Sequence, residues 1–119
     1  MTYQTIMSII AVHWIADFVL QTDWQAKNKS SNNKALFAHV TSYTVALYVY
    51  AIIFLPVEVV YLWTFSNSLL HLITDYFTSR INTYLWSKGR VHDFFVSVGF
   101  DQVIHYACLF GTLFYFGGA

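Results

Sequence analysis

The residues that could do chemistry lie where an apolar helix normally has none. Seven histidine and aspartate side chains interrupt four strongly apolar stretches: His13, Asp17, His39, His71, Asp75, Asp101 and His105. Six of the seven form His/Asp pairs spaced four residues apart, and residues four apart lie on one face of a helix. Imidazole and carboxylate groups are ligands for Zn, Mn and Fe. The spacing therefore predicts side chains that point together at a metal.

The three carboxylates in this set need something that offsets their charge. A charged residue at the centre of a membrane helix costs about 2.5–3.5 kcal/mol. Protonation of the aspartates, pairing of each aspartate with a protonated histidine, or a divalent metal could each compensate. One ion takes three or four protein ligands, and seven candidates exceed that number. We therefore predict two ions of Zn, Mn or Fe that share a bridging aspartate.

Asp17 and Asp75 are the predicted catalytic carboxylates. An α-helix rises 1.5 Å per residue, so the positions of the seven groups along antiparallel helices place them all in one layer, in one half of the bundle. Asp17 and Asp75 lie nearest the end of the helices on that side. A metal pair with open positions binds water and activates it for hydrolysis. Tyr43, Asn67 and Gln102 could orient the ligands, with ordinary helix packing as the alternative.

The composition indicates which class of protein holds these residues. Of 119 residues, 57% are hydrophobic and 10% are charged, against about 25% charged in a typical soluble domain. A formal net charge of zero excludes a basic nucleic-acid-binding protein, and the apolar content excludes a disordered chain. The single cysteine, Cys108, excludes a disulfide scaffold and is predicted to be a small buried hydrophobe. We expect one integral membrane domain over residues 1–119.

Four stretches are long and apolar enough to cross a membrane, which takes about 20 residues per helix. They cover about residues 3–21, 35–55, 57–77 and 93–116. Pro56 predicts a tight hairpin between the second and third, because proline is favoured at the start of a helix. Between the third and fourth, apolar residues at helical spacing flanked by basic ones predict a short interfacial helix over residues 78–90. The predicted fold is an all-α four-helix membrane bundle.

The basic residues predict the orientation of this bundle. All six fall in the two longer connections, residues 22–34 and 78–92: Lys27, Lys29, Lys34, Arg80, Lys88 and Arg90. Cytoplasmic loops of membrane proteins carry an excess of Lys and Arg. We therefore expect both connections on the cytoplasmic side and both termini on the far side of the membrane.

Local signals predict how these connections fold. Thr22 with Gln25 three residues later predicts a capping box for a short helix, and Asn33 is the predicted N-cap of the second span. His92 and Asp93 lie at the start of the fourth span, where a solvated or helix-capping role is expected.

The motifs around these residues resemble those of one family. The matching segments are His13-x3-Asp17-Phe18-x-Leu20-Gln21, Trp24-x2-Lys27, His39-x3-Tyr43, His71-x3-Asp75 and Asp101-Gln102-x2-His105. Together they resemble the domain-of-unknown-function 3307 family of small bacterial and phage membrane proteins, which has no established reaction. The resemblance implies a four-helix integral membrane protein of bacterial or phage origin. In the bacterial inner membrane, the far side, on which the basic residues predict both termini, is periplasmic or extracellular.

A more distant likeness concerns the His-x3-Asp pairs alone. They are similar to those of proteins described as membrane-bound metal-dependent hydrolases. That likeness implies metal binding by six residues: His13, Asp17, His71, Asp75, Asp101 and His105.

Three functions are consistent with the sequence. The first is metal-dependent hydrolysis of an ester or phosphoester in a lipid-like substrate at the cytoplasmic leaflet. The second is transport of protons or divalent metal, but the far half, including residues 45–55 and 109–116, is nearly devoid of ionisable groups. The third is a non-catalytic accessory membrane protein. Membrane lipid is the expected partner and nucleic acid is not; a homo-oligomer is compatible with each function.

Overall fold

The chain is all-α in the computed structural model, which describes residues 1–117. The five α-helices are α1 (Tyr3–Trp14), α2 (Asp23–Asn28), α3 (Asn33–Phe54), α4 (Val60–Ser87) and α5 (Val91–Tyr115). A π-helical turn, Ile15–Val19, extends α1, and a 3-10 turn, Val57–Val59, precedes α4. No strand occurs within residues 1–117. The all-α prediction is therefore confirmed.

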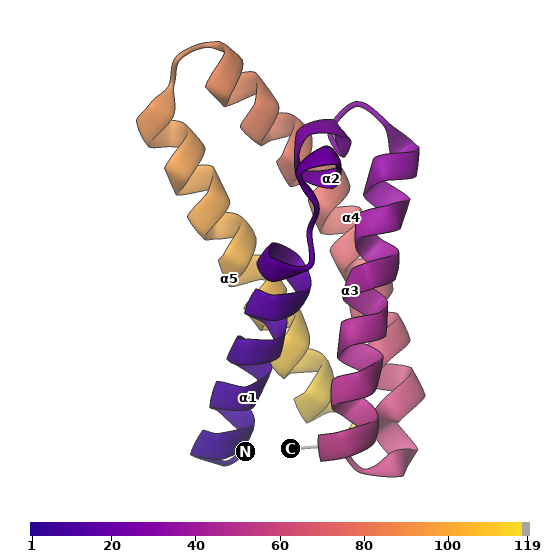
Figure 1. Cartoon of the computed structure of the whole chain (residues 1–119). Helices are drawn as coiled ribbons and strands as arrows, with labels where there is room; N and C mark the ends of the chain where they lie inside the picture. Colours follow the sequence, from indigo (N-terminus) through magenta and orange to yellow (C-terminus); the bar gives the residue numbers. More distant parts are fainter. Residues whose placement is uncertain (118–119) are drawn as a thin grey trace.

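The helices form an elongated bundle of 45 × 27 × 21 Å. Helices α3 and α4 make an antiparallel hairpin, α5 packs along α4, and α1 packs against α3 (Figure 1). The C-terminal half of α4 and the N-terminal half of α5 lean away from α3 together (Figure 1). The short helix α2 lies at the same end of the molecule as the α4–α5 turn, whereas the α3–α4 turn lies at the opposite end.

The predicted separate interfacial helix over residues 78–90 is wrong. These residues instead continue α4 without a break as far as Ser87, so the helix has 28 residues. The physical reason is that neither glycine nor proline occurs between Thr78 and Ser87 to end the helix. The chain turns only at Gly89, whose φ of 68° is a left-handed conformation that glycine adopts without a steric penalty.

The helix caps agree with the predictions in one case and differ in another. Thr22 and Gln25 form the predicted capping box at the start of α2. The N-cap of α3 is Asn32 and not Asn33, because the Asn32 side chain accepts a hydrogen bond of 2.9 Å from the Lys34 amide. Asn33 is instead the first residue of the helix.

Two helices are long and apolar enough to span a membrane, judged by length and composition alone. They are α3, with a mean hydropathy of 1.6, and α5, with 1.3. The apolar helix Tyr3–Val19 is shorter, and α4 is longer but less apolar. Two of the four predicted spans therefore meet this criterion within the described chain, and the four-span bundle stays a prediction.

The apolar core lies in the half of the molecule away from α2. Its buried residues come from α1, α3, the 3-10 turn, α4 and α5 and include Ile9, Leu47, Trp63 and Leu113. Trp63 also donates from its indole nitrogen to the Leu109 carbonyl at 2.9 Å. This core fixes the relative positions of α3, α4 and α5 and leaves the other half of their shared interior to polar residues.

Candidate metal centre

Asp17 enters the interior from a widened helical turn. The Leu20 amide donates to the carbonyl of Ile15, five residues earlier, at 2.9 Å, which defines a π-turn. Such turns insert an extra residue into an α-helix and are frequent at functional sites. Asp17 is 4% exposed, and its Oδ1 lies 2.9 Å from His39 Nε2. The turn thus directs this carboxylate towards α3.

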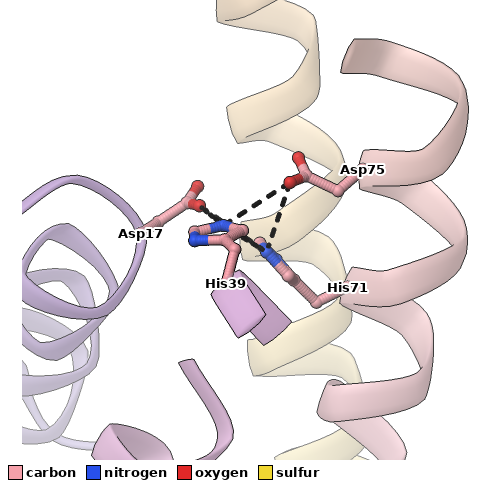
Figure 2. Close-up of side chains that lie close together, drawn as sticks. All are labelled: Asp17, His39, His71 and Asp75. Atoms are coloured by element: carbon pink, nitrogen blue, oxygen red, sulfur yellow. Dashed lines mark hydrogen bonds and ion pairs between the residues drawn. The ribbon is translucent and has the colours of Figure 1, made fainter. Parts of the chain in front are cut away.

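Four of the predicted residues converge on one point between the helices (Figure 2). Asp17, His39, His71 and Asp75 are all buried, and one ligand atom from each lies within 4.8 Å of the others. Both histidines contribute Nε2, and the His–Asp and His–His separations between the converging atoms run from 2.9 to 3.7 Å. A tetrahedral ion with ligands at about 2.0–2.1 Å holds them roughly 3.3 Å apart. The separations thus match those of a ligand set.

The contacts around His39 Nε2 cannot all be hydrogen bonds at the same time. His39 Nε2 lies 3.1 Å from His71 Nε2 and 2.9 Å from Asp17 Oδ1. A neutral imidazole carries one N–H, so of two facing ring nitrogens at most one can donate while the other accepts. Carboxylates only accept when ionised. A metal ion at this point would be contacted by a lone pair from each of the four atoms, so a metal ion fits this set.

A second group adjoins the first and shares Asp17 with it. Its other members are Asp101 and His105, both buried. His105 Nε2 lies 3.2 Å from Asp101 Oδ2 but has no well-directed hydrogen-bond partner. Asp101 is held in place by Thr78 Oγ1, which donates to its Oδ1 at 2.6 Å, and by Gln102 Nε2 at 3.1 Å. Because a carboxylate has two oxygens, Asp17 could contact an ion in each group.

His13 lies beside both groups but belongs to neither. Its Nδ1 is 3.0 Å from the Tyr43 hydroxyl, and its Nε2 is 2.7 Å from Gln102 Oε1 and 3.6 Å from Asp17 Oδ2. With both ring nitrogens engaged, this geometry suits a residue that orients Asp17. Tyr43 also stacks on the His71 ring with centroids 3.8 Å apart. A metal-binding role for His13 stays a prediction.

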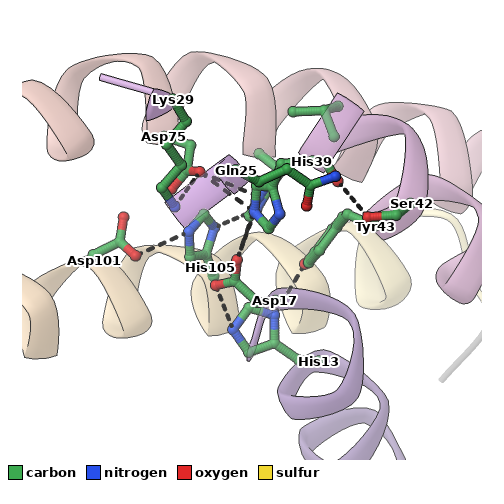
Figure 3. A network of polar contacts seen from close by, with 12 residues as sticks. His13, Asp17, Gln25, Lys29, His39, Ser42, Tyr43, Asp75, Asp101 and His105 are labelled. Carbon is green, nitrogen blue, oxygen red and sulfur yellow. Dashed lines mark hydrogen bonds and ion pairs between the residues drawn. The ribbon is translucent and has the colours of Figure 1, made fainter. Parts of the chain in front are cut away.

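Lys29 also reaches the site, and the sequence analysis did not identify it. Its Nζ lies 2.8 Å from Asp75 Oδ2, the same oxygen that lies 3.5 Å from His39 Nε2 (Figure 3). Lys29 follows directly after α2, so the capping box that starts α2 also positions this lysine. The signal in the sequence was the clustering of basic residues in the connection after Asp17, at the end of the helices nearest Asp17 and Asp75. A flexible lysine side chain can reach inward from such a loop.

Several other candidate residues lie outside the site. Asn67 is buried but donates to the Trp63 carbonyl and to Thr112 in the apolar half. Asp93 pairs with Arg90 at 2.6 Å on the exposed start of α5, in line with its predicted solvated role. Cys108 is partly buried and forms no disulfide.

A small cavity opens beside the two groups. It has a volume of about 120 Å³ and is bordered by all three aspartates and by Gln21, Lys29 and Gln102, among others. That volume holds several water molecules. We call it the metal-site cavity. The centre is therefore buried on the side of the apolar core and accessible on the side of α2.

Residues 5–116 match the family model described as a protein of unknown function, DUF3307. The chain belongs to this family. The match confirms the resemblance to the domain-of-unknown-function 3307 family, and it covers every residue of both ligand groups. No curated protein and no solved structure matches the chain.

Proposed function

We propose that this protein is a membrane-embedded metal enzyme that hydrolyses an ester or phosphoester in a lipid-like substrate. The observation that carries the proposal is the convergence of two imidazole nitrogens and two carboxylate oxygens within 4.8 Å of one another in a buried site. Nitrogen and oxygen ligands in this combination suit Zn, Mn or Fe. The second group, which shares Asp17, supports a centre of two ions.

The chemistry follows from what such ions do when bound. A divalent ion lowers the pKa of its water to about 7 and polarises an ester or phosphoryl oxygen. Hydrolysis then adds water across the bond and releases an acid and an alcohol. In this chain, Asp17 and Asp75 border the cavity from which water and substrate would enter. Either carboxylate could accept the proton that the attacking water loses, which supports their predicted catalytic role.

A membrane location is supported by the apolar surface. Only 17% of the most apolar stretch of α5 is buried in the chain, and Phe95, Phe100 and Val103 are each about 60% exposed. Soluble proteins rarely expose contiguous apolar patches of more than a few hundred Å². The basic residues lie in and directly after α2, at the start of α3, in the C-terminal half of α4 and at the α4–α5 turn, which favours a cytoplasmic location for that end (Figure 1). Four crossings would place the metal-site cavity near this interface.

Transport is less well supported. A path for ions needs polar groups along the whole length of the bundle. Beyond the His/Asp layer, the interior is occupied by the apolar core, in which Leu47, Trp63 and Leu113 are completely buried. Among the described residues, the buried polar groups of that half, such as Thr64 and Asn67, are neutral.

The first test is the metal content of the protein purified in detergent. We expect close to two ions per chain by inductively coupled plasma mass spectrometry, and fewer in His71→Ala. His92→Ala is the matched control, because His92 is exposed and lies in neither ligand group. Wild-type protein that folds but holds no metal after dialysis against Zn, Mn and Fe would overturn the proposal.

The second test is hydrolysis itself. We expect the metal-loaded protein to release p-nitrophenol from bis-p-nitrophenyl phosphate or from p-nitrophenyl butyrate. Chelation and the Asp75→Asn substitution should each abolish release, whereas His92→Ala should not. A loaded protein that leaves both probes intact but carries divalent ions into liposomes would favour transport instead.

A further inference from the structure

A larger cavity lies next to the metal-site cavity. It has a volume of about 500 Å³ and is lined by α2, the residues that follow α2, the C-terminal half of α4 and the start of α5. We call it the α2–α4 groove. Its size is within the range of small-molecule sites, about 300–1,000 Å³. Lys29, Ser79 and Asn82 line both cavities, so these three residues form a wall that the groove shares with the metal-site cavity.

The lining of the groove favours an anion. Lys27 and Lys29 both border it, together with four hydroxyl side chains and one amide. Within the described chain, none of the residues that line the groove is acidic. Ammonium and hydroxyl groups are donors, and hydrogen bonds to a charged acceptor such as phosphate are about twice as strong as neutral ones.

One buried donor in the groove has no partner. Ser79 is 6% exposed, and its hydroxyl forms no hydrogen bond. A hydroxyl side chain within a helix can donate to the carbonyl four residues earlier, as Thr41 does at 2.8 Å. The Asn82 amide oxygen is also buried without a partner. Buried polar atoms are normally satisfied, so these two groups indicate a ligand with both acceptor and donor oxygens.

The other end of the groove is apolar. Trp86 from α4 and Phe94 from α5 line it, with their rings 5.1 Å apart in an edge-to-face arrangement. Trp86 is 59% exposed. Tryptophan is enriched at the membrane–water interface. The groove therefore has a polar end, with Lys29, Ser79 and Asn82, next to the metal-site cavity and an aromatic end away from it.

We propose that the α2–α4 groove binds the phosphate headgroup of an amphiphile, with the phosphate at Lys27, Lys29 and Ser79 and the glycerol or acyl portion along Trp86 and Phe94. This inference rests on the proposed function, because bound metal offsets the three aspartates that would otherwise repel a phosphate at the inner end of the groove. It assigns the substrate class as a phosphoester and not a carboxylic ester.

The test is binding of dihexanoyl phosphatidic acid to the full chain in neutral detergent, measured by the change in tryptophan fluorescence. Inorganic phosphate and dihexanoylglycerol are the two comparison probes. We expect phosphatidic acid to bind at least tenfold more tightly than either. Equal binding of inorganic phosphate would assign the groove to free phosphate, and equal binding of dihexanoylglycerol would remove the phosphate contact; either result overturns the inference.

Two variants test the residues. Ser79→Ala should weaken phosphatidic acid binding about tenfold, because it removes one hydrogen bond to a charged group. Lys27→Met should weaken it about three- to fivefold, and more at low ionic strength, because Lys27 is an exposed charge. Lys34→Met is the matched control, since Lys34 is an exposed lysine that lines neither cavity. Unchanged affinity in both test variants would overturn the assignment.

Metal content measured on the same samples separates this inference from the proposed function. Ser79→Ala and Lys27→Met should keep the wild-type metal content, so a loss of lipid binding in them belongs to the groove. A metal-free wild-type protein that still binds phosphatidic acid through Ser79 would refute the metal centre and support the groove. Metal-loaded protein that does not bind phosphatidic acid would support the metal centre and refute the assignment of the groove.

Discussion

Asp17 belongs to both ligand groups, and replacing it tests whether two ions share it. His39 belongs only to the first group and His105 only to the second. At a free metal concentration ten times the wild-type Kd, we expect close to two ions per wild-type chain. His39→Ala and His105→Ala should each keep about one ion, and Asp17→Asn should lose part of both.

The size of the Asp17→Asn effect follows from the contacts of the carboxylate. Its Oδ1 lies 2.9 Å from His39 Nε2 and 3.6 Å from His71 Nε2, and the asparagine keeps an oxygen there but no negative charge. Losing one charged contact costs about 1.5–3 kcal/mol, which weakens binding roughly 10–100-fold at each ion. At the stated metal concentration, occupancy then falls to about 0.2–1 ion per chain.

The assay is equilibrium dialysis followed by elemental analysis of protein in detergent. Asp93→Asn is the matched control, because Asp93 is an exposed aspartate outside both groups. If Asp17→Asn retained two ions, Asp17 would not be a ligand that the two ions share. A full complement retained in His105→Ala would refute the second ion and leave a single site.

Three further predictions concern the surroundings of the centre. Lys29→Met should raise metal affinity at least severalfold in a chelator competition, because the ammonium group competes with the ion for Asp75 Oδ2 at 2.8 Å; unchanged or weaker binding would contradict this. Tyr43→Phe should lower the free energy of unfolding by about 1–3 kcal/mol in a denaturant titration without changing metal content, because His13 Nδ1 loses its partner at 3.0 Å; loss of an ion would instead give Tyr43 a role in the centre. Gly89→Ala should cost about 1–2 kcal/mol in the same titration, because its φ is 68°; an unaltered midpoint would show that the turn adjusts.

The spacing of residues was enough to predict that most of the His/Asp side chains lie close together, although His13 belongs to neither ligand group. Positions four apart share a helix face, and the antiparallel order of the helices follows from short connections, so Asp17, His39, His71 and Asp75 could be placed in one layer. The all-α class followed from composition in the same way. These features depend on helical periodicity, which local sequence encodes directly.

The features that the sequence analysis missed depend on tertiary contacts or on small differences in local energy. Lys29 is 46 residues from Asp75, and their contact depends on how α2 folds back on the bundle. The π-turn at Asp17 has no residue signature. The continuation of α4 to Ser87 was missed because amphipathic spacing is compatible with both a separate interfacial helix and an extension of the same one.

Charge balance couples the metal centre to the α2–α4 groove. Asp17, Asp75 and Asp101, with Lys29 beside them, leave two negative charges when the histidines are neutral. One divalent ion balances these charges, whereas a second leaves two positive charges that are costly in a buried site unless anions join them. A phosphate dianion in the adjoining groove would supply that balance, and by thermodynamic reciprocity the second ion should then tighten phosphate binding by the same factor. Titration of metal into the protein should therefore show a second ion whose Kd falls at least severalfold when dihexanoyl phosphatidic acid is present, while the first is little changed. A second Kd that is indifferent to the lipid would mean that the anion sits too far away to share the charge of the centre.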